Sequence, residues 1–164
     1  MKKLTYYSVL ILSLCGCSRN EEKANKNAQS AESPTAVPAK TLSIPYVVEY
    51  NEQTQKNELK HDAKDDFTNM SVEDMIKAVN LRYPKIQLEL LKTDPDVVHV
   101  KINDAAYLSQ AMGSSGAQIY MTESTYALTE VKGISSVEFI FQEGDHASPG
   151  LYTRESFKDG LEVK

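Results

Sequence analysis

A polar segment, residues 18–41, most restricts where this 164-residue chain can fold. It consists mainly of Asn, Lys, Glu, Ala and Ser, with Pro34 and Pro38 near its end. Such a segment cannot bury enough apolar surface to offset the entropy lost on ordering, so we predict a flexible tether over residues 17–41. The large apolar side chains lie before and after it. We therefore expect one folded domain, and place it in residues 42–164.

A short apolar run stands before the tether. Lys2 and Lys3 precede it, and it ends in Leu14-Cys15-Gly16-Cys17, which is similar to the lipobox of bacterial lipoprotein signals. The run is shorter than the roughly 20 residues that a membrane-spanning helix needs. The resemblance implies that a signal peptide over residues 1–16 is removed and that Cys17 is lipidated, with acyl chains such as palmitate.

A lipidated Cys17 implies an extracytoplasmic place in the cell envelope. Ser18 stands where an Asp marks inner-membrane retention in enterobacterial lipoproteins, so in a Gram-negative host we expect the outer membrane. No disulfide or cysteine-based metal site is expected in the domain, because both cysteines lie within residues 1–17.

The charge balance disfavours nucleic acid as a partner. Loss of residues 1–16 would remove Lys2 and Lys3 and leave 16 basic against 23 acidic side chains. Binding to nucleic acid or anionic lipid relies on basic residues. We therefore expect membrane contact through the lipid on Cys17 alone. The expected partner is another envelope protein or a cell-wall component.

Hydrophobic patterns in the domain predict two helices. Ser71 is an N-cap candidate, and the residues after it repeat apolar side chains at helical spacing up to Pro84. A second helix is predicted from Gly116 to Val131, with a capping box of Ser115 and Gln118 and with Gly133 as its C-cap.

Four strands are predicted around these helices, over residues 42–50, 86–91, 97–102 and 137–141. Asp94-Pro95-Asp96 would turn the middle two strands into a hairpin. Residues 51–69 are polar and predict a loop, and the stretch after Gly144 predicts a loop and a frayed end. The order β-α-β-β-α-β is typical of an α+β, ferredoxin-like split βαβ sandwich.

Four short pieces stand out within residues 100–145. They are Val100-Lys101-Ile102-Asn103-Asp104, Ala127-Leu128-Thr129-Glu130, Gly133-Ile134-Ser135-Ser136-Val137 and Glu143-Gly144-Asp145. Together they resemble the pattern of the GerMN-like domain, a family named after a sporulation and spore-germination lipoprotein. These motifs are structural rather than catalytic. The resemblance therefore implies a fold and an envelope location more than an activity.

One polar cluster is a candidate for ligand binding or catalysis. It consists of Asp145, His146 and Ser148, with Arg154 further along. A Ser-His-Asp relay needs all three side chains within hydrogen-bonding reach, which neighbours in one loop seldom achieve. The alternatives are a small binding site, or a loop that these residues merely shape.

A second candidate is the turn Gly113-Ser114-Ser115-Gly116, whose backbone N–H groups at a helix start could hold an anion. It lacks the Lys of a phosphate-binding loop, so a simple loop and cap is the competing interpretation. His61, Asp62, Asp65 and Asp66 do not have the spacing of a calcium-binding loop. We expect no metal site and no cofactor.

Two hypotheses follow for the domain. The first is a non-enzymatic binding or scaffolding module of an envelope lipoprotein. The second is a small-ligand receptor or an enzyme centred on the Asp145-His146 loop, which requires Asp145, His146 and Arg154 to converge in one pocket.

Overall fold

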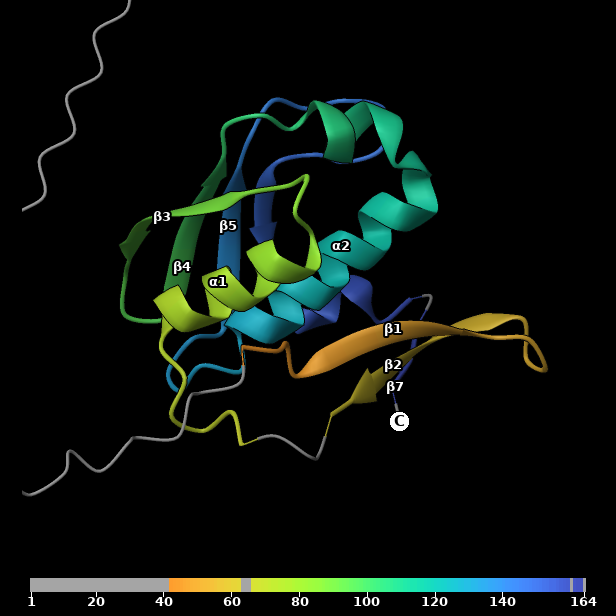
Figure 1. Ribbon diagram of the computed structural model, residues 1–164, viewed down its shortest axis with the longest axis horizontal. Helices are drawn as coiled ribbons and strands as arrows, with labels where there is room; N and C mark the ends of the chain where they lie inside the picture. The colour runs from red at the N-terminus through yellow and green to blue at the C-terminus, as the bar shows by residue number, and fades with distance from the viewer. Residues whose placement is uncertain (1–41, 63–65, 160, 164) are drawn as a thin grey trace, which may run out of the picture. The chain divides into compact units, whose positions relative to one another are not determined.

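The computed structural model describes residues 42–62, 66–159 and 161–163 (Figure 1). The predicted signal peptide, the predicted lipidation site Cys17 and the predicted tether lie outside these residues. Among the described residues, no helix has the length and apolar character needed to cross a bilayer.

The described residues form an α+β domain with two sheets (Figure 1). The three-stranded sheet has the order β1-β2-β7, with β1 (Tyr46–Asn51), β2 (Lys56–His61) and β7 (Leu161–Val163). The four-stranded sheet has the order β3-β4-β5-β6, with β3 (Leu88–Thr93), β4 (Val97–Ile102), β5 (Ser136–Ile140) and β6 (Gly150–Tyr152). The predicted hairpin is confirmed, because β3 and β4 pair antiparallel.

Helix α1 (Val72–Arg82) begins as the sequence predicts. The side chain of Ser71 accepts a 3.2 Å hydrogen bond from the backbone N–H of Asp74. The helix ends before Pro84, whose ring disfavours helical backbone at the preceding residue. Its apolar side faces the core, with Met75 and Val79 fully buried.

Helix α2 (Gly113–Leu128) lies between the two sheets, since it contacts β5 of one and β1 of the other. Every residue from Tyr120 to Leu128 is buried. A helix that is enclosed on several sides does not need a single apolar stripe. This explains why its sequence pattern is less regular than that of α1.

The predicted bounds of α2 are wrong. The helix begins at Gly113 rather than Gly116, and neither Ser115 nor Gln118 caps it. It follows a π-helical turn (Tyr107–Ala111), and Met112 connects the two. At the other end Thr129 is the C-cap, and its hydroxyl donates back to the Thr125 carbonyl at 2.8 Å.

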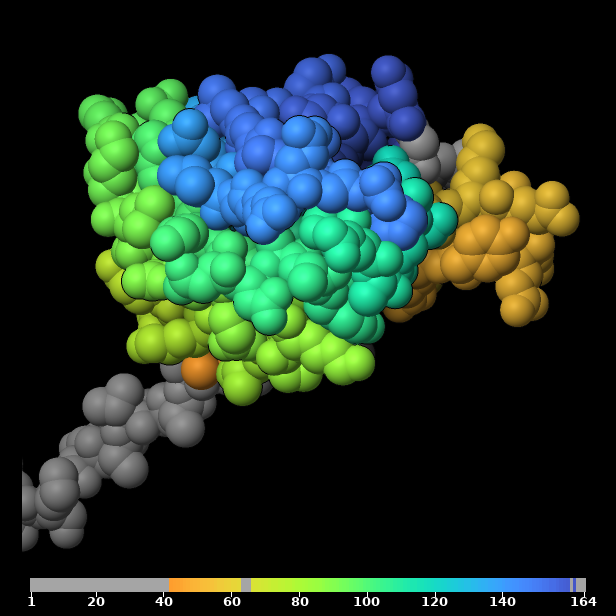
Figure 2. Space-filling view, turned by 90° about the horizontal axis from the view of Figure 1, so that it is seen from above, coloured from red at the N-terminus to blue at the C-terminus, as the bar shows by residue number. Residues whose placement is uncertain are grey.

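The predicted loop over residues 51–69 is also wrong, because β2 lies within it. Asn51 accepts from the backbone N–H groups of Gln53 and Thr54, and Gln55 adopts a left-handed φ of 55°. After this turn the chain runs back along β1 as an antiparallel hairpin, whose turn projects from the rest of the domain (Figure 2). The polar composition of β2 conceals the strand, although Leu59 is fully buried.

The described part of the C-terminal stretch forms regular elements where a loop and a frayed end were predicted. It contains β6, a 3₁₀ turn (Arg154–Phe157) and β7. Tyr152 packs edge-on against Phe139 and stacks on Phe157, with ring centroids 5.8 and 5.7 Å apart. Two aromatic contacts thus fix a segment that is too short to show a strand pattern.

The finer fold prediction, a ferredoxin-like split βαβ order, is not confirmed. That arrangement would place β1 in the same sheet as β3, β4 and β5. Instead β1 pairs with β2, and β2 pairs in parallel with β7. The strand–helix–strand unit β4-α2-β5 is present, with β4 and β5 parallel.

Candidate functional site

The loop after β5 brings together three of the four predicted cluster residues. Asp145, His146 and Ser148 line a shallow depression of about 290 Å³. The backbone N–H of His146 donates to the Ser109 carbonyl at 3.0 Å, which fixes the loop against the π-helical turn. Gly144 permits this approach, since a Cβ there would lie 2.7 Å from the Ser109 carbonyl oxygen.

The predicted anion-binding turn adjoins the same loop. Nδ1 of His146 lies 3.1 Å from Oγ of Ser114, so one member of Gly113-Ser114-Ser115-Gly116 contacts the cluster. The Ser148 hydroxyl donates to Glu143 at 2.7 Å. His146 therefore contacts Ser114, while Ser148 is paired with a different side chain, and the relay of a Ser-His-Asp enzyme is not formed.

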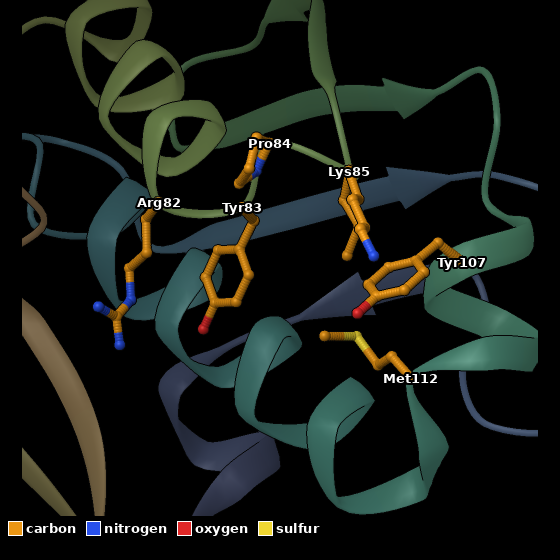
Figure 3. Close-up of a pocket in the computed structure, with 7 residues that line it drawn as sticks. Arg82, Tyr83, Pro84, Lys85, Tyr107 and Met112 are labelled. Carbon is orange, nitrogen blue, oxygen red and sulfur yellow. The ribbon is translucent and has the colours of Figure 1, made fainter.

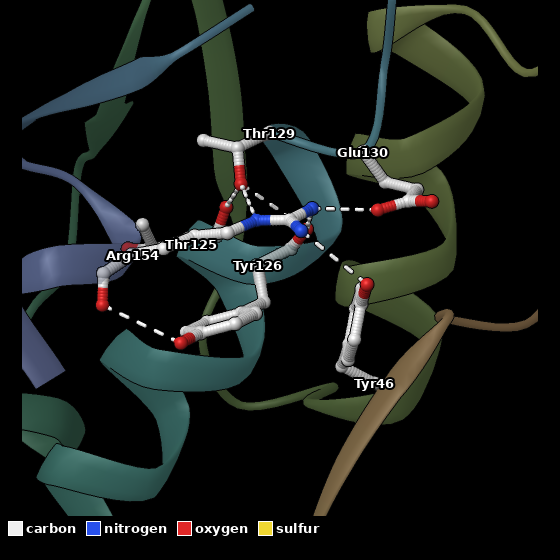
Figure 4. Close-up of polar contacts among 6 residues, drawn as sticks. All are labelled: Tyr46, Thr125, Tyr126, Thr129, Glu130 and Arg154. Carbon is white, nitrogen blue, oxygen red and sulfur yellow. Dashed lines mark hydrogen bonds and ion pairs between the residues drawn. The ribbon is translucent and has the colours of Figure 1, made fainter. Parts of the chain in front are cut away.

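Arg154 lies elsewhere (Figure 4). Its guanidinium donates to the Thr129 hydroxyl at 2.8 Å, to the Glu130 carboxylate at 2.6 Å, and to the carbonyl of Tyr126 at 3.2 Å. It also lies 5.0 Å from the ring centroids of both Tyr46 and Tyr126. The expected convergence of Asp145, His146 and Arg154 is thus not found, and Arg154 ties the C-terminal segment to the end of α2.

A buried carboxylate, which the sequence analysis did not single out, joins α1, α2 and β1. Glu123 has no exposed surface, and its Oε1 accepts from the backbone N–H of Val48 at 2.7 Å and from Nη2 of Arg82 at 3.0 Å. Its Oε2 accepts from Nε of Arg82 and from the Tyr83 hydroxyl, each at 2.5 Å. Burial of a carboxylate is tolerated only with such pairing.

These contacts shift the pKa values of the two titratable donors, Arg82 and Tyr83. The hydrogen bond to Glu123 raises the pKa of Arg82 above its ordinary value. Burial, together with the hydrogen bond to Glu123, raises the pKa of Tyr83 well above 10. Both side chains are therefore held in their protonated forms and in fixed positions at the end of α1.

Arg82 and Tyr83 form part of one wall of a cleft of about 320 Å³ (Figure 3). The lining residues come from two segments: Arg82, Tyr83, Pro84, Lys85 and Ile86 after α1, and Tyr107 and Met112 at the π-helical turn. We refer to this site as the aromatic cleft. Most of its lining is apolar, which is typical of small-molecule sites.

The π-helical turn sets the opposite wall of the aromatic cleft. The backbone N–H of Met112 donates to the Tyr107 carbonyl at 2.9 Å, which is the wide hydrogen bond of a π turn. The turn places the side chains of Tyr107 and Met112 on the same side, facing Tyr83 and Lys85 (Figure 3). Such turns are frequent at functional sites.

Sequence reasoning missed the aromatic cleft, although one signal pointed to Glu123. Tyr120, Tyr126 and Ala127 lie three or four positions from Glu123 and therefore share its side of the helix. A charged residue on an apolar side is a sign of a buried, paired group. No local pattern connects residues 82–86 with Tyr107 and Met112, because only the fold brings the two segments together.

Comparisons with protein-family models, with curated proteins and with solved structures returned no match. The GerMN-like resemblance and the lipoprotein assignment therefore remain predictions from the residues.

Proposed function

We propose that this chain is an envelope lipoprotein, anchored through lipid on Cys17, whose folded domain is a non-enzymatic binding module. The lipobox-like Leu14-Cys15-Gly16-Cys17 and the polar segment after it support the anchor. The unit β4-α2-β5 agrees with the order of elements in the GerMN-like pattern, which supports an envelope role.

The aromatic cleft is the observation that carries the binding role. Two tyrosines, a proline, an isoleucine and a methionine supply an apolar surface, and its position is fixed by the Glu123 contacts with Arg82 and Tyr83. A preformed apolar cleft with a few polar groups is the usual form of a ligand site. Because its walls are held before any ligand arrives, little ordering entropy opposes binding.

The anchor is tested by metabolic labelling with an alkyne-bearing palmitate. We expect label on the wild-type chain in the membrane fraction and none on Cys17→Ser. Cys15→Ser is the matched control, because that cysteine lies within the predicted signal peptide, and it should keep the label. Label that persists in Cys17→Ser would refute the anchor.

The binding site is tested by a fragment screen on the full chain carrying Cys17→Ser, with ¹³C-labelled methionine methyl groups observed by NMR. Met112 lines the aromatic cleft, and Met121 lines the depression beside His146. Ligands of the cleft should shift the Met112 methyl signal and leave that of Met121 unchanged. If no fragment shifts Met112, the cleft is not the binding site.

The same screen tests the second candidate function, a small-ligand receptor or enzyme at the Asp145-His146 loop. The contact between His146 and Ser114 beside the 290 Å³ depression favours it. Ligands of this site should shift the Met121 signal, and His146→Ala should abolish that shift without changing the response of Met112.

A further inference from the structure

The two cations that line the aromatic cleft differ in their pairing. Nε and Nη2 of Arg82 donate to Glu123, so that guanidinium is already neutralised by a buried carboxylate. Nζ of Lys85 instead lies 4.5 Å from the centroid of the Tyr107 ring. Among the described residues, no carboxylate lines the cleft.

Among the described residues Lys85 has no ion pair, so its charge gives the aromatic cleft a positive end in an acidic chain. The ammonium of Lys85 sits over the face of Tyr107, where the negative face of the ring holds it near the cleft without neutralising it. An ammonium group donates up to three hydrogen bonds, and a ring face satisfies none of them fully. Lys85 therefore remains available to a ligand anion.

The remaining walls select the body of the ligand. Tyr83 and Tyr107 come from opposite walls of the cleft, and the thioether of Met112 points toward the space between them (Figure 3). Aromatic rings and thioethers pack well against flat, apolar groups. The volume of about 320 Å³ lies near the lower end of the range for small-molecule sites, so the ligand is compact.

We propose that the aromatic cleft binds a compact organic anion with a flat apolar body, whose carboxylate or sulfonate pairs with Lys85. The apolar body then lies against Tyr83, Tyr107 and Met112. This inference rests on the proposed function, since it names the ligand class of the same cleft.

Two probes with the same body and different charge test the inference: 2-naphthoate and its neutral amide, 2-naphthamide. Each is titrated into the full chain carrying Cys17→Ser, and the Met112 methyl signal gives the dissociation constant. We expect naphthoate to bind about two- to fivefold more tightly than naphthamide, the range for one exposed ion pair. Added salt should reduce the difference.

Substitutions at Lys85 then assign the preference to one side chain. Lys85→Met keeps an apolar stem and removes the charge, so it should make the two affinities equal, whereas Lys85→Arg should restore the preference. Lys132→Met is the matched control, because Lys132 is exposed in the loop before β5 and away from the cleft lining. It should leave both affinities unchanged.

The outcomes separate this inference from the proposed function. If both probes shift Met112 equally, and Lys85→Met changes neither affinity, the cleft binds apolar ligands but has no preference for anions. That result overturns the inference and leaves the binding module intact. If neither probe and no fragment of the screen shifts the Met112 methyl signal, both proposals fail.

Discussion

The backbone N–H of Val48 in β1 donates a 2.7 Å hydrogen bond to the carboxylate of Glu123 in α2, 75 positions later in the chain. The donor belongs to the edge of β1 that does not pair with β2, since β2 is the only neighbour of β1 among the described strands. A buried side chain thus replaces a neighbouring strand at this point. The same carboxylate holds Arg82 and Tyr83, so the three-stranded sheet and the aromatic cleft depend on one residue.

Glu123→Gln should lower the free energy of unfolding by about 2–4 kcal/mol. The amide group of glutamine places a donor against the donors of Val48, Arg82 or Tyr83 and so leaves buried polar groups unpaired. Urea unfolding measures the loss, and the m-value should not change. Glu155→Gln is the control: its partner is Lys158 and both side chains are largely exposed, so a change below about 0.5 kcal/mol is expected. Equal effects of the two substitutions would contradict the role of Glu123.

Arg154→Lys should lower the free energy of unfolding by about 1–2 kcal/mol, although the charge is kept. A lysine cannot reproduce the forked donation to Thr129, Glu130 and the Tyr126 carbonyl, nor the packing of a flat guanidinium between two rings. Thermal unfolding followed by circular dichroism measures the effect. Lys158→Arg, at an exposed pair, serves as the control and should leave the melting temperature unchanged. A wild-type melting temperature for Arg154→Lys would show that the network is dispensable.

The sequence predicts those elements whose determinants lie close together in the chain. The start of helix α1 was predicted correctly, because the Ser71 cap and the apolar repeat both lie within one short segment. The β3–β4 hairpin was also predicted, from Asp94-Pro95-Asp96 between two apolar runs. The strand β2 was missed because it contains a single large apolar residue, Leu59, among polar ones. One apolar residue is too few to show the alternating pattern of a strand.

The candidate site was predicted less well than the fold. One depression is lined by Asp145, His146 and Ser148, because residues so close in one loop are also close in space. Arg154 was grouped with them by proximity in sequence, but two aromatic rings and Glu130 hold it elsewhere. The lining of the aromatic cleft comes from residues 82–86 and from Tyr107 and Met112, which lie about 20 positions later. No local sequence pattern can predict that two such distant segments come into contact.

Gly144→Ala should destabilise the domain by about 1–3 kcal/mol. The new Cβ would lie 2.7 Å from both Cβ and the carbonyl oxygen of Ser109, so the loop that carries His146 must move away from the π-helical turn. Gly116→Ala is the matched control, because its Cβ would meet only the flexible side chain of Met112, at 3.0 Å. Urea unfolding should show a clearly smaller change for Gly116→Ala, and the opposite ranking would refute the close approach at Ser109.

Stability should fall with rising pH above about 10, in part through Tyr83. Burial and the hydrogen bond to Glu123 raise the pKa of Tyr83 in the folded state, whereas an unfolded tyrosine releases its proton near pH 10. The contribution of Tyr83 is therefore complete below pH 10 and declines above it, by at most about 1.4 kcal/mol per pH unit. Tyr83→Phe should lower the free energy of unfolding at pH 8, because the hydroxyl bonded to Glu123 is lost, but it should make the fall in stability between pH 10 and 11.5 less steep.

Urea unfolding at pH 8 and between pH 10 and 11.5 measures both effects, with Tyr50→Phe, at an exposed side chain, as the control. An equally steep decline in Tyr83→Phe and in the wild type would show that Tyr83 does not contribute to it.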